Sequence, residues 1–213
     1  MQTFPATETT FLLPGAAGNI EILATPADPE NTKAAVAVIC HPHPLHGGTM
    51  TNKVVSTIAR ACKNLGLRTV RFNFRGVGKS EGSFADGIGE TEDLLRVIEW
   101  AKQTCPGDAL WLAGFSFGGY IAARAATQIP DVAQLITVAP QASRFTAAPF
   151  TPITCPWVLV QGEKDEVVSA EEVFAWVETL ELKPTIIRMP DAGHFFHGKL
   201  LELRERLESV LLK

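Results

Sequence analysis

Residues 109–120 read ALWLAGFSFGGY, and this stretch decides the fold. An apolar run typical of a buried strand ends at Gly114, and an alanine-rich helical stretch begins just after Ser116. One serine therefore lies between a strand and a helix, in the pattern G-x-S-x-G of a nucleophile elbow. Glycine at 114 and 118 removes side chains that would collide around a strained serine. Ser116 is the candidate nucleophile.

The same turn leaves the first amide groups of the helix without partners and directs them at whatever the hydroxyl attacks. The N–H of Phe117 is the candidate donor to an oxyanion formed there. The alternative is a strand, a turn and a helix that carry a serine between glycines by chance. The pentapeptide alone does not decide, so the hypothesis requires catalytic partners elsewhere in the chain.

The size and composition of the chain indicate an ordinary globular domain. Its 213 residues predict one domain over residues 1–213, and 46% apolar with 20% charged residues excludes a disordered chain. A net charge of −4 provides no basic face, which makes nucleic acid an unfavourable partner. No run approaches the roughly 18 apolar residues that a membrane helix needs, so no membrane partner is expected.

Four cysteines are irregularly spaced and form no C-x-x-C pair: Cys40, Cys62, Cys105 and Cys155. They indicate free thiols in a reducing compartment. Residues 1–14 lack a basic start followed by an apolar segment, so a cytoplasmic location is the expectation. The sequence leaves the oligomeric state open between a monomer and a homodimer.

Strands and helices alternate along most of the chain. Strands are predicted at Thr9–Leu13, Asn19–Thr25, Ala34–Cys40, Leu67–Phe74, Ala109–Gly114, Val132–Ala139, Trp157–Gln161 and Pro184–Met189. Helices are predicted at Asn52–Leu65, Glu90–Lys102, after Ser116, at Ala170–Leu180 and at Lys199–Leu212, with an irregular connection at Pro140–Pro156. This alternation predicts an α/β protein: a mostly parallel sheet with an antiparallel N-terminal edge and helices on both faces.

In such sheets the functional site lies beyond the carboxyl ends of the strands, and two later strands end in suitable residues. Glu163, Asp165 and Glu166 follow the strand that ends at Gln161, and Asp165 has the best placement of the three. His194 follows the last strand. The order serine, acid, histidine is the order that this type of elbow uses. Ser116, Asp165 and His194 are therefore the predicted catalytic triad.

The chain resembles the α/β-hydrolase superfamily over essentially its whole length. The resemblance rests on the elbow Gly114–Gly119, the acid loop Gly162–Asp165, the histidine loop Ala192–His194, and Asn73–Ser80, which is similar to D-x-R-G-x-G-x-S with Asn73 in place of Asp. More narrowly, His41–Pro44, Gly47–Met50 and Arg71–Gly76 resemble small bacterial hydrolases close to the dienelactone-hydrolase type. A serine nucleophile departs from the cysteine of dienelactone hydrolases proper. The resemblance therefore implies a serine esterase with the α/β-hydrolase fold and no cofactor.

In the relatives, the turn after the third strand supplies the second oxyanion donor, usually from an H-G-x segment. Here this segment reads His41-Pro42-His43, and prolines have no N–H. The resemblance therefore implies His43 as the second donor beside Phe117. Leu45 is the alternative, because its amide is also free and the register of the turn is not determined by the sequence.

Many relatives insert a helical cap between the strands at Val138 and Trp157, and here the connection is too short for one. A site without a cap is shallow and open, which favours esters with short acyl chains. Candidate apolar walls for the substrate are Leu45, Phe115 and Phe195.

Three other interpretations compete with the serine esterase. His41, His43 and His46 lie within six residues, which suggests a metal-dependent hydrolase, although Leu45 stands where the corresponding zinc motif has aspartate. Gly76–Ser80 suggests a phosphate-binding loop, although the required first glycine is Asn73. The third is a non-catalytic binding protein on a hydrolase scaffold. The sequence favours the esterase, with no metal.

Overall fold

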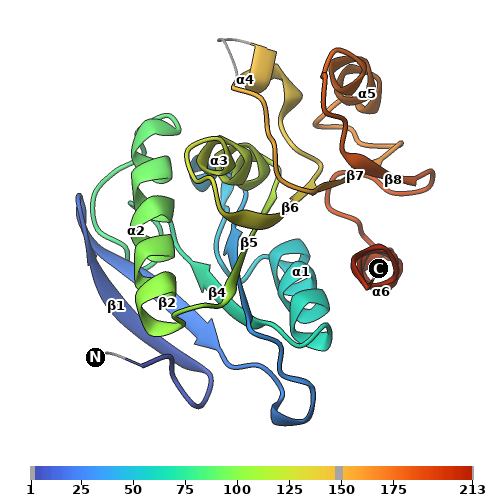
Figure 1. Ribbon diagram of the computed structural model, residues 1–213. Helices are drawn as coiled ribbons and strands as arrows, with labels where there is room; N and C mark the ends of the chain where they lie inside the picture. The colour runs from blue at the N-terminus through green and yellow to red at the C-terminus, as the bar shows by residue number, and fades with distance from the viewer. Residues whose placement is uncertain (1–2, 147–150, 213) are drawn as a thin grey trace.

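Within residues 3–146 and 151–212, which the computed structural model describes, eight strands form one sheet in the order β1-β2-β4-β3-β5-β6-β7-β8 (Figure 1). The strands are β1 (Thr9–Gly15), β2 (Gly18–Thr25), β3 (Ala35–Cys40), β4 (Arg68–Phe72), β5 (Ala109–Phe115), β6 (Val132–Val138), β7 (Trp157–Gly162) and β8 (Thr185–Met189). β4, β3 and β5 to β8 run parallel, so their carboxyl ends share one edge of the sheet. The predicted parallel sheet is confirmed.

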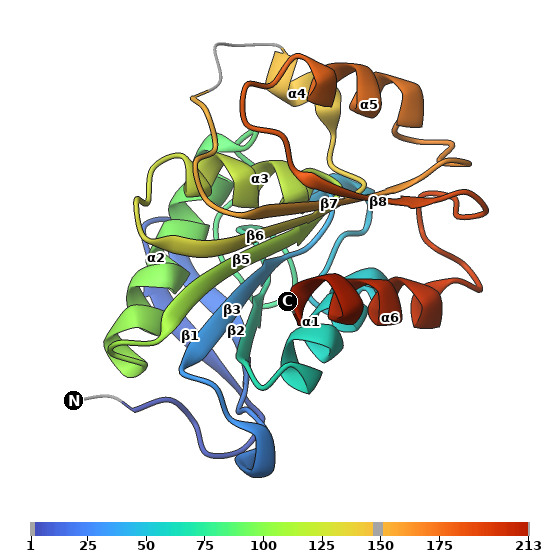
Figure 2. The ribbon, with the colours of Figure 1, turned by 45° about the vertical axis from the view of Figure 1, so that its right-hand side comes forward.

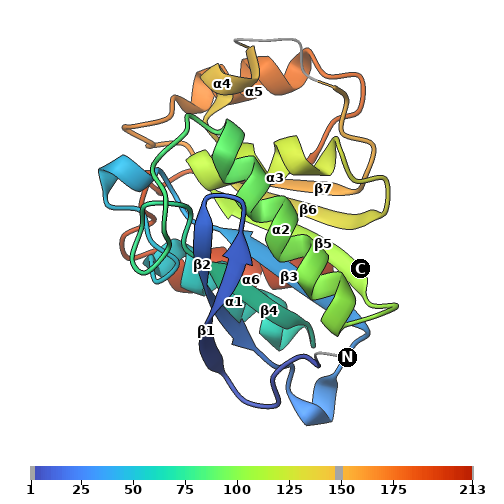
Figure 3. The same ribbon diagram turned by 90° about the vertical axis from the view of Figure 1, so that its left-hand side faces the viewer.

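The N-terminal hairpin forms the predicted antiparallel edge. β1 pairs with β2, and β2 pairs with β4, both antiparallel. Figure 3 shows this hairpin at one side of the molecule, beside α2. Arg96 of that helix donates from Nε to the carbonyl of Pro14 at 2.9 Å, which fixes the tip of the hairpin.

Helices cover both faces of the sheet (Figure 2). They are α1 (Lys53–Asn64), α2 (Ile88–Thr104), α3 (Phe117–Ala126), α4 (Ala142–Thr146), α5 (Ala170–Glu178) and α6 (Leu200–Leu211). α1 and α6 share a core with the α1-facing side chains of β3 and β5, whereas α2, α3 and α5 pack on the opposite face. β3 and β7 are buried along their whole length, as continuous apolar runs predict for strands covered on two faces.

The structure differs from the predicted elements at the end of β4 and in the connection after β6. β4 ends at Phe72 rather than at Phe74, because the amide of Phe74 leaves the sheet. Asn73 N–H still donates to the carbonyl of Glu21 in β2, whereas Phe74 N–H donates to the ring of His41. The connection predicted to be irregular contains the short helix α4, and residues 147–150 of that connection lie outside the described part.

Two short 3₁₀ helices were not predicted: η1 (Pro29–Asn31) and η2 (Pro44–His46). Each has a proline at its start, where the missing N–H costs nothing. All four cysteines are free, as predicted, and Cys40, Cys62 and Cys105 are buried. Within the described residues, no helix has the length and apolar character that crossing a bilayer requires.

Candidate active site

Ser116 lies at the junction of β5 and α3 in a strained backbone conformation. Its φ is 55° and its ψ is −119°, a combination that costs an L residue about 1–3 kcal/mol. Neighbouring hydrogen bonds maintain the strain: Ser116 N–H donates to Val138 O, and Ser116 O accepts from Gly119 N–H and Tyr120 N–H. The side chain is therefore held at the carboxyl edge of the sheet.

Gly114 and Gly118 are required because backbone atoms approach them closely. A Cβ at Gly114 would lie 2.1 Å from the carbonyl oxygen of Gly118. A Cβ at Gly118 would lie 2.4 Å from the carbonyl oxygen of His41. Both distances are far below van der Waals contact. The turn is thus built tightly against the end of β3, where the predicted oxyanion segment begins.

Asp165 and His194 are hydrogen-bonded across the loops that follow β7 and β8. His194 Nδ1 lies 2.8 Å from Asp165 Oδ2. Oδ1 of Asp165 accepts from the amides of Val167 at 2.9 Å and Val168 at 2.7 Å. Burial by itself would raise the pKa of Asp165, but the bonds from His194 and from these amides bring it below its usual value. The carboxylate therefore stays ionised and holds the histidine proton on Nδ1.

Glu166 supports the same histidine from a second direction. Its Oε2 accepts from the backbone N–H of His194 at 3.1 Å. Lys164 N–H donates to Ala192 O at 3.0 Å, which joins the two loops again. The sequence suggested Glu166 only as an alternative acid. Its role depends on a contact between two distant loops, for which the chain carries no local signal.

The histidine ring packs against the residue that precedes the serine. The ring centroids of His194 and Phe115 lie 5.0 Å apart, and His194 is 3% exposed. Among the described residues, Ser116 Oγ has no hydrogen-bond partner, so the contact between serine and imidazole is not closed in this structure. Such bonds are often long in unliganded enzymes and tighten when substrate binds.

The two predicted oxyanion donors lie next to each other. Their rings are in contact, with centroids of His43 and Phe117 5.0 Å apart. In the described part of the chain, the amides of His43 and Phe117 donate no hydrogen bond. Leu45 N–H instead donates to Nδ1 of His43 at 3.3 Å, so the His43 side chain caps the start of η2. The amide of the alternative donor is therefore already used.

His41 is a buried structural residue. It is fully buried, its Nδ1 lies 2.6 Å from Pro42 O, and its Nε2 accepts from Phe74 N–H at 3.0 Å. Burial lowers the pKa of His41 to about 4, so the ring is neutral. Because both ring nitrogens of His41 are used, this residue has no lone pair for a metal. His43 stacks on His46 with centroids 4.4 Å apart, and His43 Nδ1 accepts from Leu45.

The Gly76–Ser80 loop faces a carboxylate rather than a phosphate site. Lys79 N–H donates to Glu21 Oε2 at 2.9 Å. Asn73 donates from Nδ2 to the same oxygen at 2.7 Å and accepts from Met50 N–H at 2.9 Å. An amide suits this position because one side faces a carboxylate and the other an N–H. Asn73 thereby anchors the segment after the oxyanion turn to β2.

The three predicted substrate contacts divide into two groups. Leu45 is 68% exposed and Phe195 is 42% exposed. Phe115 is fully buried, with its ring against those of His194 and Phe195. Phe115 therefore packs beneath the surface against the ring of His194, whereas Leu45 and Phe195 present apolar surface to solvent.

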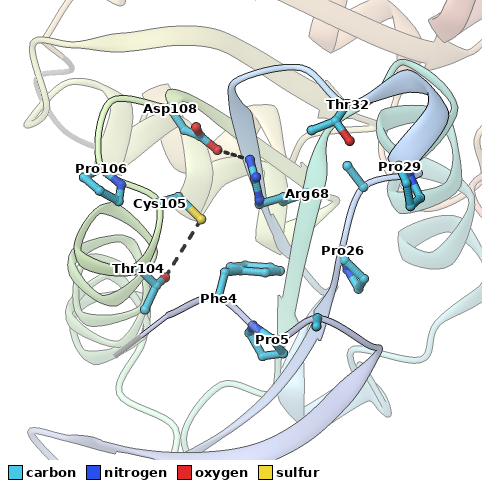
Figure 4. Close-up of a pocket in the computed structure, with 12 residues that line it drawn as sticks. Phe4, Pro5, Pro26, Pro29, Thr32, Arg68, Thr104, Cys105, Pro106 and Asp108 are labelled. Carbon is cyan, nitrogen blue, oxygen red and sulfur yellow. Dashed lines mark hydrogen bonds and ion pairs between the residues drawn. The ribbon is translucent and has the colours of Figure 1, made fainter. Parts of the chain in front are cut away.

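A large cavity lies elsewhere, at the amino ends of the parallel strands (Figure 4). It has a volume of about 530 Å³, and its walls include Phe4, Pro26, Cys105 and the ion pair of Arg68 with Asp108. None of the candidate catalytic or oxyanion residues, all of which lie in the described part, lines this cavity. Burial raises the pKa of the Cys105 thiol, so this cysteine is a poor nucleophile.

Comparison with known proteins agrees with the fold. A family profile described as alpha/beta hydrolase fold matches residues 44–155, just over half of the chain. An uncharacterized protein of Rickettsia prowazekii is 32% identical over 93% of this chain and 86% of its own length.

Two solved structures are similar over almost the whole chain. An alpha-beta serine hydrolase homologue from Coxiella burnetii is 48% identical with a TM-score of 0.94, covering 98% of this chain and 100% of that one. A serine hydrolase without a lid from Xanthomonas campestris is 43% identical with a TM-score of 0.93, covering 98% and 95%. The chain therefore belongs to the α/β-hydrolase fold family and is similar to its serine hydrolases that have no lid.

Proposed function

We propose that this protein is a serine hydrolase that cleaves small carboxylic esters through an acyl-enzyme, with Ser116, His194 and Asp165 as its triad. One observation carries the proposal. The imidazole that is hydrogen-bonded to Asp165 packs against Phe115, the residue that precedes the strained serine. This supports the assignment of Ser116 as nucleophile, His194 as base and Asp165 as orienting acid, because such a set of groups activates a serine hydroxyl.

In the first half of the reaction, Ser116 Oγ attacks the ester carbonyl carbon and His194 Nε2 takes the hydroxyl proton. The carbonyl oxygen becomes an oxyanion that accepts from the amides of His43 and Phe117. Each donor is expected to contribute about 2.7–4 kcal/mol of transition-state stabilisation. Asp165 stabilises the imidazolium, and His194 then protonates the leaving alcohol as the C–O bond breaks.

In the second half, a water molecule attacks the acyl-enzyme. His194 takes a proton from this water, and the same two amides hold the second oxyanion. Collapse releases the carboxylic acid and returns the proton to Ser116 Oγ. No step requires a metal or a cofactor.

Two features support small substrates. The short connection between β6 and β7 leaves no chain for a cap, and Leu45 and Phe195 are exposed apolar groups at this edge. A series of p-nitrophenyl esters from acetate to dodecanoate tests the size limit. We expect kcat/KM to be greatest for short acyl chains. A kcat/KM that continued to rise beyond about eight carbons would contradict an open, shallow site, since each buried methylene contributes about 0.8 kcal/mol.

The central test is covalent labelling with a fluorophosphonate, followed by mapping of the modified residue. We expect one label, on Ser116, and a loss of both labelling and p-nitrophenyl butyrate hydrolysis in Ser116→Ala. Ser143→Ala is the matched control, because this serine lies in α4 and outside the triad. A binding protein on an idle scaffold would not be labelled. Hydrolysis that survived in Ser116→Ala would refute the proposal.

A further inference from the structure

Arg144 of α4 lies against the nucleophile elbow. The carbon of its guanidinium lies 5.1 Å from the centre of the Phe117 ring and 5.7 Å from that of Tyr120. Phe117 directly follows Ser116 and carries one of the proposed oxyanion donors. A fixed positive charge therefore lies one aromatic ring away from the reacting groups.

The surroundings of Arg144 leave part of its guanidinium available. Nε donates to Gln141 Oε1 at 3.0 Å, and Nη1 donates to Asp86 Oδ1 at 3.0 Å. Nη2 has no hydrogen-bond partner among the described residues. The Arg144 side chain is 24% exposed and that of Asp86 is 78% exposed. An ion pair with so solvated a carboxylate is weak, so an incoming carboxylate can compete for the guanidinium.

The Phe117 ring on which Arg144 lies is packed among other aromatic rings. The ring of His43 packs on Phe84 with centroids 4.9 Å apart and on Phe117 with centroids 5.0 Å apart. After burial and the neighbouring His46, the charge of Arg144 is a further cause that lowers the pKa of His43, which is consistent with its closeness to the oxyanion turn. A cation beside aromatic side chains, with a free planar donor, matches the geometry of a carboxylate.

We propose that Arg144 binds a free carboxylate of the substrate, so that the preferred esters are half-esters of dicarboxylic acids. The inference rests on the proposed esterase function and adds its substrate class. The ester carbonyl would lie between Ser116 and the amides of His43 and Phe117. The second carboxylate would accept a hydrogen bond from Nη2 of Arg144.

The test compares charged esters with neutral esters of the same shape. Monoethyl succinate is paired with ethyl 4-methylpentanoate, and monoethyl glutarate and adipate are paired with their isopropyl-ended counterparts. Ethanol release gives kcat/KM for each. In Arg144→Met, the ratio of charged to neutral kcat/KM should fall about ten- to a hundredfold for the best pair, the effect of losing one charge-assisted hydrogen bond. Arg144→Lys should give an intermediate ratio, because lysine keeps the charge without the planar fork.

The variant Asp86→Asn tests whether Arg144 binds the substrate or only holds α4 in place. Asparagine tolerates the positive φ of 50° at this position and removes the competing charge. If Arg144 binds substrate, the ratio in Asp86→Asn stays at the wild-type value or rises. If Arg144 only ties α4 to residue 86, Asp86→Asn resembles Arg144→Met and both variants affect charged and neutral esters equally.

An unchanged ratio in Arg144→Met for all three pairs would overturn the carboxylate subsite. The proposed function is judged separately, by the Ser116-dependent hydrolysis of the neutral esters. If the wild-type protein did not hydrolyse the neutral esters, the proposed esterase function would be refuted. If it did hydrolyse them, and Arg144→Met left the ratio of charged to neutral kcat/KM unchanged, only the role of Arg144 would be refuted.

Discussion

Two pairs of a carboxylate with a nitrogen-containing side chain lie at opposite edges of the same sheet. Asp165 and His194 join the loops after β7 and β8 at 2.8 Å, and Asp108 and Arg68 join the starts of β5 and β4 at 2.5 Å. The acids are similarly inaccessible, with side chains 0% and 11% exposed. By contact geometry alone, either pair could belong to an active site.

The groups around each pair show which of the two belongs to the candidate active site. The carboxyl edge also carries a strained serine and two amides without partners among the described residues. At the amino edge the neighbours are prolines, the ring of Phe4 and a buried thiol around the cavity (Figure 4). The candidate catalytic residues therefore do not line this cavity. Parallel strands direct free amides and loop side chains to their carboxyl ends, and there the nucleophile can be activated.

The largest expected effect comes from Asp165→Asn. The asparagine oxygen can still accept from Val167 and Val168, but its NH₂ then faces His194 Nδ1. This forces the histidine proton onto Nε2, the wrong tautomer for accepting the serine proton. We expect kcat to fall about 10⁴-fold, as for the same change in a Ser-His-Asp protease. Steady-state hydrolysis of p-nitrophenyl butyrate measures it.

Circular dichroism is the control for Asp165→Asn, because the variant should keep its fold. A variant that retained more than a tenth of the wild-type kcat would show that Asp165 matters no more for catalysis than Asp108 does. The comparison between the two edges of the sheet would then fail.

A second difference between the edges is their response to acid. His41, at the carboxyl edge, has a folded pKa of about 4 against 6.5 in the unfolded chain. Between these values only the unfolded chain gains the proton, so the folded state loses stability as the pH falls from 6.5 toward 4. The contribution amounts to roughly 3 kcal/mol. Urea unfolding at a series of pH values measures it.

His41→Gln is the matched variant for this effect, since glutamine keeps an acceptor for Phe74 N–H and does not titrate. Its unfolding free energy should depend less steeply on pH in that window, even if its overall stability is lower. Because the pKa of Asp165 is lowered in the folded state, the protein also loses stability at lower pH, as this carboxylate is protonated below the usual pKa of an aspartate. An equal slope in both proteins would show that another group titrates.

The smallest expected effect comes from Asp108→Asn at the amino edge. Arg68 is 28% exposed, so water replaces part of the lost contact. We expect the free energy of unfolding to fall by about 1 kcal/mol, with kcat/KM as in wild type. Thermal unfolding and the esterase assay on the same sample check both. A fall in kcat comparable to that of Asp165→Asn would mean that the amino edge takes part in function.

Much of the fold could be predicted from local pattern. Apolar runs marked the buried strands, and glycines around Ser116 marked the elbow, because each signal lies within a few consecutive residues. The end of β4 could not be predicted, since the amide of Phe74 leaves the sheet for the ring of His41, 33 positions earlier in the chain. The short helix α4, which positions Arg144, could not be predicted either, because its connection shows no apolar periodicity.

The sequence by itself determined the α/β class, the antiparallel edge, the elbow and the order of serine, acid and histidine, because apolar periodicity and glycine positions are local properties of the chain. Tertiary structure alone decided that Asp165 rather than Glu163 or Glu166 bonds the histidine ring. It also decided that the amide of Leu45 donates to His43, while the amide of His43 donates to none of the residues described. These choices depend on hydrogen bonds between groups that meet only when distant strands align. The distances and directions between such groups are set by how the strands pack, not by any local pattern in the sequence.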